Sequence, residues 1–247
     1  MKLCITISIV LSVLCSAHLV RESQSGAVVQ QVEMKDAADF LSRLKQERLR
    51  NLYQSATWTL SHDYHDFKHM EEVLTYVQHF MEALIAHQQG NSASLSKLGG
   101  LKGFKDQMAA WLNDNDQAVR AYAAIMLGIC SDRAYAKQLG NLLARTDDRD
   151  ELIQYDRGRA AMALGLVGAQ EYTSRLVKLL TSKNEYDRAG AAYGLGFLTA
   201  KTQAPAIAKL LKDKDEDVRE AAKESLEMIG AGDLKNRSNT PESRPRQ

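Results

Sequence analysis

Three histidines in the N-terminal half of the chain have the spacing of a metal site. His62, His65 and His69 lie three and four positions apart, with Asp66 among them, which would place all four side chains on one face of a helix. Imidazole and carboxylate groups could bind zinc, copper or nickel there. One helix seldom supplies a whole coordination sphere, however, and the neighbouring Asp, Lys and Glu are equally typical of a solvated face. Both interpretations stay open.

The rest of the sequence offers no complete reaction centre. It has no Gly-rich phosphate loop and no Ser-His-Asp arrangement, and all six histidines precede residue 88. Cys130 aligns with Val167, Leu198 and Ile229 of later repeats, so we expect a small buried hydrophobe rather than a nucleophile. The sequence therefore predicts a protein that is not an enzyme and needs no cofactor.

The first 17 residues have the order of a secretory signal. Lys2 precedes an apolar run and the small residues Ser16 and Ala17, and the run is too short for an ordinary membrane span. A retained anchor is the first alternative, and a lipoprotein modified at Cys15 is the second. We expect a periplasmic or secreted protein.

Net charge argues against a nucleic-acid partner. Residues 1–17 contain one charged residue, Lys2. Their removal therefore leaves 31 basic and 31 acidic residues. This balance predicts no attraction to nucleic acid or to an anionic membrane.

The fold that must position these residues is all-α. The only prolines are Pro205, Pro241 and Pro245, and the apolar residues recur at intervals of three and four. The segment from Phe67 to Leu84 shows this stripe most clearly.

The C-terminal half contains four copies of one helical signature. Each copy has an arginine, a small residue three positions later and a leucine seven positions later, preceded by a helix that ends in an apolar pair such as Leu210-Leu211. Such helix pairs bury their apolar faces only by stacking on one another. The arginines are Arg120, Arg157, Arg188 and Arg219, the alanines are Ala123, Ala160, Ala191 and Ala222, and the leucines are Leu127, Leu164, Leu195 and Leu226.

This signature resembles the HEAT-like repeats first named from phycobiliprotein lyases, whose pattern is a leucine pair, an Asp-rich turn, Val-Arg, paired alanines and Leu-Gly. The turns are 113–116 and 212–215, followed by Val119-Arg120 and Val218-Arg219. The resemblance implies a right-handed α-solenoid of about four HEAT-like helical hairpins. It is specific for architecture and says little about function.

The repeated arginines have two interpretations. In families of this type the arginine bonds across the repeat to carboxylates of the turn, which here implies Asp116 and Asp215. The alternative is an arginine ladder that grips an acidic partner. We favour the structural role, because an arginine present in every repeat answers a need that every repeat shares.

The second helix of each of the first three repeats is apolar on nearly all sides, so something must cover its second face. We favour the chain's own N-terminal helices over a partner. Six extra residues between Ala144 and Asp156 form either a longer surface loop or a binding loop. The candidate partner-binding residues are Tyr122, Ile125, Leu152, Tyr155, Arg159, Met162 and Tyr193.

The expected organisation follows from these features. The segments are a signal peptide (1–17), a flexible leader (18–30), an N-terminal helical region (31–90), a hinge (91–103), the HEAT-like solenoid (104–233) and a disordered tail (234–247). The leading function hypothesis is an exported scaffold or adaptor that binds another protein. A metal-handling protein and a secreted effector that acts on a host protein are the alternatives.

Overall fold

The computed structural model describes residues 37–44, 46–62, 67–145 and 155–231, and all regular structure in these ranges is helical. This confirms the all-α prediction. None of the helices in the same ranges is long and apolar enough to cross a membrane. The expected signal peptide, leader and tail lie outside the described residues.

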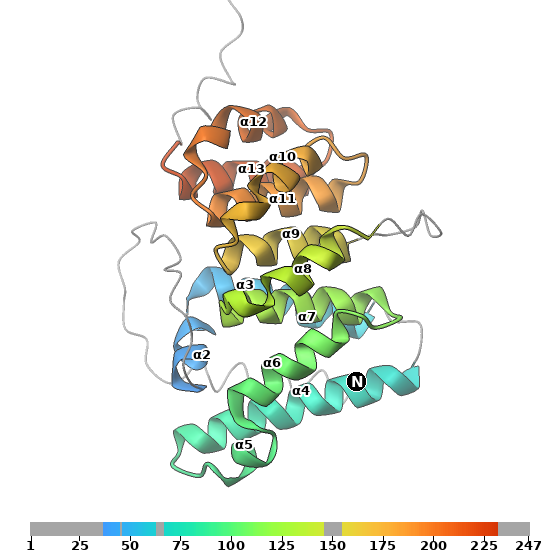
Figure 1. Cartoon of the computed structure of the whole chain (residues 1–247), viewed down its shortest axis with the longest axis vertical. Coiled ribbons are helices and arrows are strands. Elements are labelled where there is room, and N and C mark those ends of the chain that lie inside the picture. The colour runs from blue at the N-terminus through green and yellow to red at the C-terminus, as the bar shows by residue number, and fades with distance from the viewer. Residues whose placement is uncertain (1–36, 45, 63–66, 146–154, 232–247) are drawn as a thin grey trace, which may run out of the picture. The chain divides into compact units, whose positions relative to one another are not determined.

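The chain forms two compact units, which we describe separately (Figure 1). The described residues up to Gln138 form unit 1, and those from Leu139 onward form unit 2. The boundary falls inside helix α8 (Ala136–Leu143).

Unit 1 contains six α-helices among its described residues, besides the start of α8. They are α2 (Ala37–Leu44), α3 (Glu47–His62), α4 (Phe67–Gln88), α5 (Ala93–Lys97), α6 (Gly100–Trp111) and α7 (Gln117–Cys130). An aromatic cluster joins three of these helices: the rings of Phe80 and Phe104 stack at 3.9 Å, and Phe40 meets both edge-on. Contacts of this kind add to the burial of the rings themselves.

Helix α7 is the buried centre of unit 1. Every residue of α7 except Gln117 and Arg120 is buried, because α2, α3 and α6 pack around it. This is the self-coverage that we favoured for an apolar second helix, here in the first repeat.

Residues 91–103, where we expected a hinge, contain α5 and the first turn of α6 and lie inside unit 1. Leu95 and Leu101 are buried and fix this Ser- and Gly-rich stretch to the core, which its composition did not reveal.

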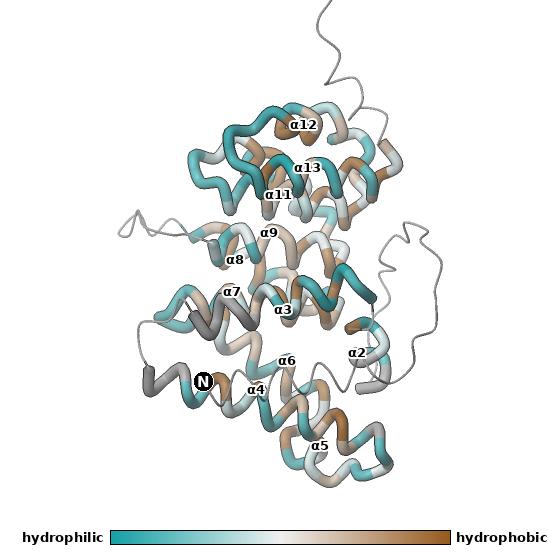
Figure 2. The backbone as a smooth tube through the Cα atoms, turned by 180° about the vertical axis from the view of Figure 1, so that it is seen from behind, coloured by the Kyte–Doolittle hydropathy of each residue, from teal (hydrophilic) through white to brown (hydrophobic). Residues whose placement is uncertain are grey.

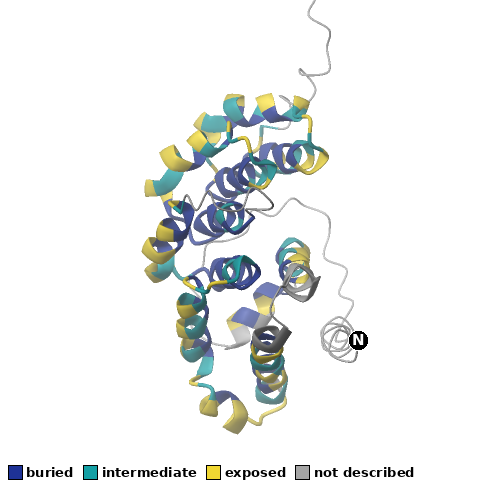
Figure 3. Ribbon diagram, turned by 90° about the vertical axis from the view of Figure 1, so that its right-hand side faces the viewer, coloured by how far each residue is buried: buried dark blue, intermediate teal, exposed yellow. Residues whose placement is uncertain are grey.

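Unit 2 alternates first helices, which carry many exposed residues, with second helices, of which α9 and α11 are mostly buried (Figure 3). The first helices are α8, α10 (Thr173–Leu179) and α12 (Ala204–Lys209), and the second helices are α9 (Asp156–Leu166), α11 (Glu185–Phe197) and α13 (Glu216–Met228). Asn184 caps α11 by accepting hydrogen bonds from the amides of Tyr186 and Asp187, as the free amides of a first turn require.

Glycines allow α9 and α11 to touch along their backbones. A Cβ atom at Gly158 would lie 2.2 Å from the carbonyl oxygen of Tyr186, one at Gly190 would lie 2.1 Å from that of Gly158, and one at Gly165 would lie 2.4 Å from that of Gly194. The N-terminal part of α9 thus contacts the N-terminal part of α11, and the C-terminal parts contact each other. The two helices therefore run parallel and in register.

Helix α13 continues this parallel stack on the other side of α11. A Cβ atom at Gly196, late in α11, would meet Ser225 at 3.0 Å, late in α13. Unlike α9 and α11, α13 carries many hydrophilic residues (Figure 2), as a terminal repeat requires.

Candidate functional site

The repeated arginines of unit 2 join neighbouring turns. Arg188 donates two hydrogen bonds to the carboxylate of Asp213, at 2.8 and 2.7 Å, and two more to the carbonyl oxygens of Ser182 and Lys183, at 2.9 and 3.0 Å. Its guanidinium lowers the pKa of Asp213 through these bonds. A bidentate arginine bond fixes both distance and orientation.

One repeat earlier, a similar two-fold bond joins Arg157 to a carboxylate in the first turn of α11 itself. Arg157 donates from Nε to Asp187 at 2.9 Å and forms a second, short bond from Nη2 to the same carboxylate. Asp187 is fully buried and also accepts a bond from the Ser182 hydroxyl at 2.7 Å. Arg120 and Arg219 donate to carbonyl oxygens of their own turns.

The carboxylates that accept these bonds from Arg157 and Arg188 are not the two predicted ones. Asp116 and Asp215 instead cap helices: Asp116 accepts a bond from the amide of Ala118, and Asp215 from that of Val218. The Asp-rich turn supplies several carboxylates, and the one directly before a helix is taken by the amides of the first turn.

Four predicted partner-binding residues are buried: Tyr122 and Ile125 in unit 1, and Tyr155 and Met162, each 5% exposed, in unit 2. Tyr122 is 1% exposed and Ile125 is 0% exposed, and burial raises the pKa of the Tyr122 hydroxyl well above its usual range. In this conformation a partner could not contact Tyr122 or Ile125 and could contact Tyr155 and Met162 only marginally. We therefore correct the partner-binding prediction for all four.

The described candidates of unit 2, of which Arg159 and Tyr193 are half-buried, lie on one side of its second helices. Tyr155, Arg159 and Met162 are four and three positions apart, spacing that shares one helix side, and Tyr193 stands on α11 where Met162 stands on α9. This side is opposite to the Arg/Ala/Leu stripe that faces the core. Leu152 lies outside the described residues.

Sequence reasoning missed Tyr186, which occupies on α11 the place that Tyr155 occupies on α9. Tyr186 is 42% exposed, and it is the one large hydrophobic residue that is exposed among the described residues. Its ring meets that of Tyr155 edge-on, with 6.0 Å between the ring centroids. Both tyrosines stand two positions before the repeat arginine, and this shared position is the signal that could have found Tyr186.

The corresponding positions on α13 are acidic. Asp217 stands where Tyr186 stands on α11, and Glu224 where Tyr193 stands. Asp217 is exposed and Glu224 is half-buried. We call the surface formed by Arg159, Tyr186, Tyr193, Asp217 and Glu224 the second-helix face of unit 2.

Arg159 sits among the tyrosines of this face. Burial lowers the pKa of its guanidinium, and Tyr155, Tyr193 and Tyr186 act electrostatically in the opposite direction. Tyrosine and arginine are the residues that most often dominate binding energy at protein interfaces. The second-helix face therefore has the composition of a protein-binding surface.

The three histidines of the proposed metal site do not lie on one described helix. His62 ends α3 and His69 lies in α4, while His65 is outside the described residues. Among the residues that the structure describes, no group of three His, Cys, Asp or Glu side chains could hold a metal ion.

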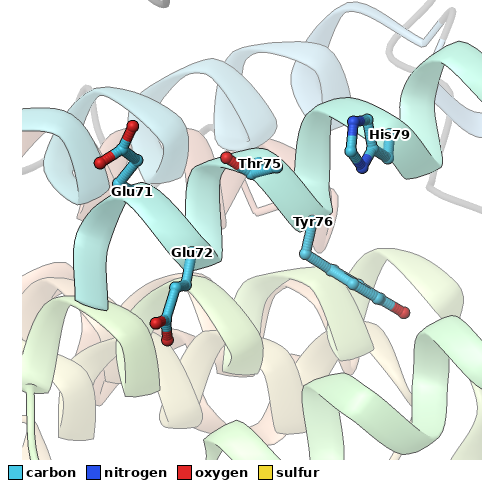
Figure 4. A pocket seen from close by; sticks show the side chains of 5 residues that line it. All are labelled: Glu71, Glu72, Thr75, Tyr76 and His79. Atoms are coloured by element: carbon cyan, nitrogen blue, oxygen red, sulfur yellow. The ribbon is translucent and has the colours of Figure 1, made fainter. Parts of the chain in front are cut away.

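A shallow cleft of about 540 Å³ in unit 1 lies along α4 and is lined by Glu71, Glu72, Thr75, Tyr76 and His79. Figure 4 shows Glu71, Thr75 and His79 on one side of the helix and Glu72 and Tyr76 on the other. The two carboxylates thus diverge and form no common ligand set. Burial raises the pKa of Tyr76, whose ring stacks on Phe104 and meets Trp111 edge-on, so its packing is sufficient to explain this shift.

Cys130 is fully buried at the end of α7. Burial raises the pKa of its thiol to about 12, so the reactive thiolate is scarce at neutral pH. The residue fits the small buried hydrophobe expected from the sequence.

Comparisons with known proteins agree with the repeat architecture. The family model described as HEAT repeats matches residues 154–227. A search of curated proteins found no match.

Similar solved structures include an engineered protein, at 16% identity and a TM-score of 0.38, with 81% of this chain and 98% of that chain covered. A designed armadillo repeat protein in complex with the peptide (KR)4 is similar at 16% identity and a TM-score of 0.37, with 79% and 100% covered. The sequence from 154 to 227 is thus similar to HEAT repeats and belongs to a chain that is helical throughout its described parts.

Proposed function

We propose that this chain is an exported, non-catalytic scaffold that binds another protein through the second-helix face of unit 2. The observation that carries the proposal is the surface itself: Tyr186 is exposed, Tyr193 and Arg159 are half-buried, and all three lie on adjacent, parallel helices. Rigid tyrosines lose little conformational freedom when a partner covers them.

The packing beneath this face supports its use as a binding surface. Backbone contacts through Gly158 and Gly190 hold α9 and α11 at a fixed separation, and Arg157 and Arg188 tie their turns to the following repeat. A surface held in this way is already organised before a partner arrives, which lowers the cost of binding.

The binding test compares two double variants in pull-downs from the exported fraction. Tyr186→Ser with Tyr193→Ser removes the aromatic side chains of the face, whereas Lys178→Ser with Lys209→Ser changes exposed residues of the first helices α10 and α12. The first variant should lose a partner that the second retains, while both melt near the wild-type temperature. A partner retained equally by both variants would contradict the proposal.

Export has its own test. Expression in a cell with a secretory pathway should yield a chain whose N-terminus, measured by mass spectrometry, starts near His18, and fractionation should find it outside the cytoplasm. A chain that keeps Met1 and stays in the cytoplasm would refute export and leave the binding proposal intact.

A further inference from the structure

The second-helix face of unit 2 carries opposite charges at its two edges. Arg159 lies on α9, Asp217 and Glu224 lie on α13, and α11 between them presents Tyr186 and Tyr193. The face thus runs from cationic through aromatic to acidic.

The register of the three helices fixes the level of each residue on this face, that is, its position along the common direction of the helices. Glycine contacts show that α9 and α11 run parallel and in register, and they bring Gly196, late in α11, against Ser225, late in α13. Counted from the repeat arginine of its own helix, Arg159 is two positions after, Asp217 two before and Glu224 five after. Arg159 therefore lies at a level between the two carboxylates, about one helical turn from each.

Small residues occupy the same level as Arg159 on the other two helices. Gly190 on α11 and Ala221 on α13 both stand two positions after their repeat arginines. Both are buried, Ala221 fully, so α11 and α13 carry no long side chain between their flanking residues at this level.

Such a face is complementary to itself. Rotation by half a turn about an axis parallel to the helices exchanges the two edges of the face and preserves the level of every residue. Arg159 of one copy then lies between Asp217 and Glu224 of the other copy, twice in the pair, and Tyr186 and Tyr193 meet their counterparts. Two-fold interfaces join identical patches in this reciprocal way.

We propose that the partner on the second-helix face of unit 2 is a second copy of this chain, joined through reciprocal contacts of Arg159 with Asp217 and Glu224 about a two-fold axis parallel to α11. The inference rests on the proposed function, because it names the occupant of the same face. Because the face mixes aromatic and charged side chains, we expect a reversible dimer with a dissociation constant of about 1 to 100 µM.

A charge swap tests this arrangement by sedimentation of the chain in the form that the producing cell accumulates. Arg159→Glu places like charges opposite each other at both ends of the pair, and so does the double variant Asp217→Lys with Glu224→Lys. Each variant alone should dimerise at least about tenfold more weakly than the wild type. An equal mixture of the two should recover the dimer, because every contact in the mixed pair is attractive again.

The matched control is Lys178→Glu, an exposed charge reversal on the first helix α10, which should leave the dimer unchanged. Unaltered circular dichroism and melting curves show that the variants fold. A wild type that stays monomeric over the stated range, or a mixture that recovers no dimer, would overturn the proposal. Loss of a different, captured protein on Tyr186→Ser with Tyr193→Ser would then still support the proposed function, so the two failures are distinguishable.

Discussion

The second helices α7 in unit 1 and α11 in unit 2 share one repeat signature and have opposite surroundings. In α7 the residue five positions after the repeat arginine, Ile125, is 0% exposed because α2, α3 and α6 surround the helix. Its counterpart in α11, Tyr193, is half-buried. The difference teaches that the repeat fixes only the inward side of a second helix, and that the outer side is free to become core or binding surface.

The largest expected effect comes from truncation of the covered side. Tyr122→Ala should lower the free energy of unfolding by about 3 to 5 kcal/mol, because it opens a cavity between α3 and α7. Tyr193→Ala, on the half-open side in unit 2, should cost about 1 kcal/mol. Urea denaturation measures both. Equal losses of unfolding free energy in the two variants would contradict the difference between the covered side of α7 and the half-open side of α11.

The next effect concerns the spacing of the helices beneath the open face. Gly190→Ala should cost about 3 kcal/mol, because its Cβ would lie 2.1 Å from a backbone oxygen of α9, and backbone yields only with strain. Gly196→Ala should cost less, since its shortest contact, 2.7 Å, is with the flexible end of Met228. Thermal melts of the two variants give the ranking, and the reverse order would show that α9 and α11 do not touch as described.

Arg188 provides a pH-dependent prediction for unit 2. Hydrogen bonds from Arg188 lower the pKa of Asp213 in the folded chain. The pair therefore stabilises the fold fully above the usual titration range of a carboxyl group, and this contribution is lost as the pH falls through the lowered pKa. Arg188→Ala should cost about 2 kcal/mol at neutral pH and less in acid.

The control for Arg188 is Arg219→Ala, because the described hydrogen bonds of Arg219 go to the carbonyl oxygens of Asp213 and Lys214 and not to a carboxylate. Its cost should be smaller and nearly independent of pH. Urea denaturation of both variants at several acidic pH values measures these costs. If the two costs changed with pH in the same way, the pairing of Arg188 with Asp213 would be contradicted.

The smallest expected effect is at Ser225 on α13. Its side chain is fully buried, and Oγ has no hydrogen-bond partner among the described residues. Ala163 and Gly194 occupy the same repeat position on α9 and α11. Ser225→Ala should thus change stability by no more than about 0.5 kcal/mol, or raise it slightly. A clear loss of stability would reveal a bond to this hydroxyl.

The helix pairs could be predicted from sequence because their signal is local and repeated. Each repeat arginine is followed at fixed distances by an alanine and a leucine, and this periodicity survives the six-residue insertion before Arg157. Which of the neighbouring carboxylates accepts the bond from an arginine could not be predicted from the local sequence. Asp213 and Asp215 stand two positions apart in one turn, and only the path of the backbone decides that the first accepts Arg188 and the second caps α13.

The candidate surface was only partly predictable for a related reason. Arg159 and Tyr193 were found from repeat alignment, whereas Tyr122, Ile125 and Met162 gave the same pattern and are buried. The burial of Tyr122 and Ile125 depends on α3, which lies far away in the sequence and has no repeat signature. No spacing within a repeat reports whether a distant helix covers it.

The comparison between the units is tested most directly by hydroxyl-radical footprinting of the wild-type chain, at a concentration low enough to disfavour a dimer. Oxidation of each tyrosine side chain, read by mass spectrometry, follows its contact with solvent. We predict rapid oxidation of Tyr186, slower oxidation of Tyr193, and protection of Tyr122 and Tyr53. Oxidation of Tyr122 as fast as that of Tyr186 would contradict the account, because the covered and open faces would then be the same.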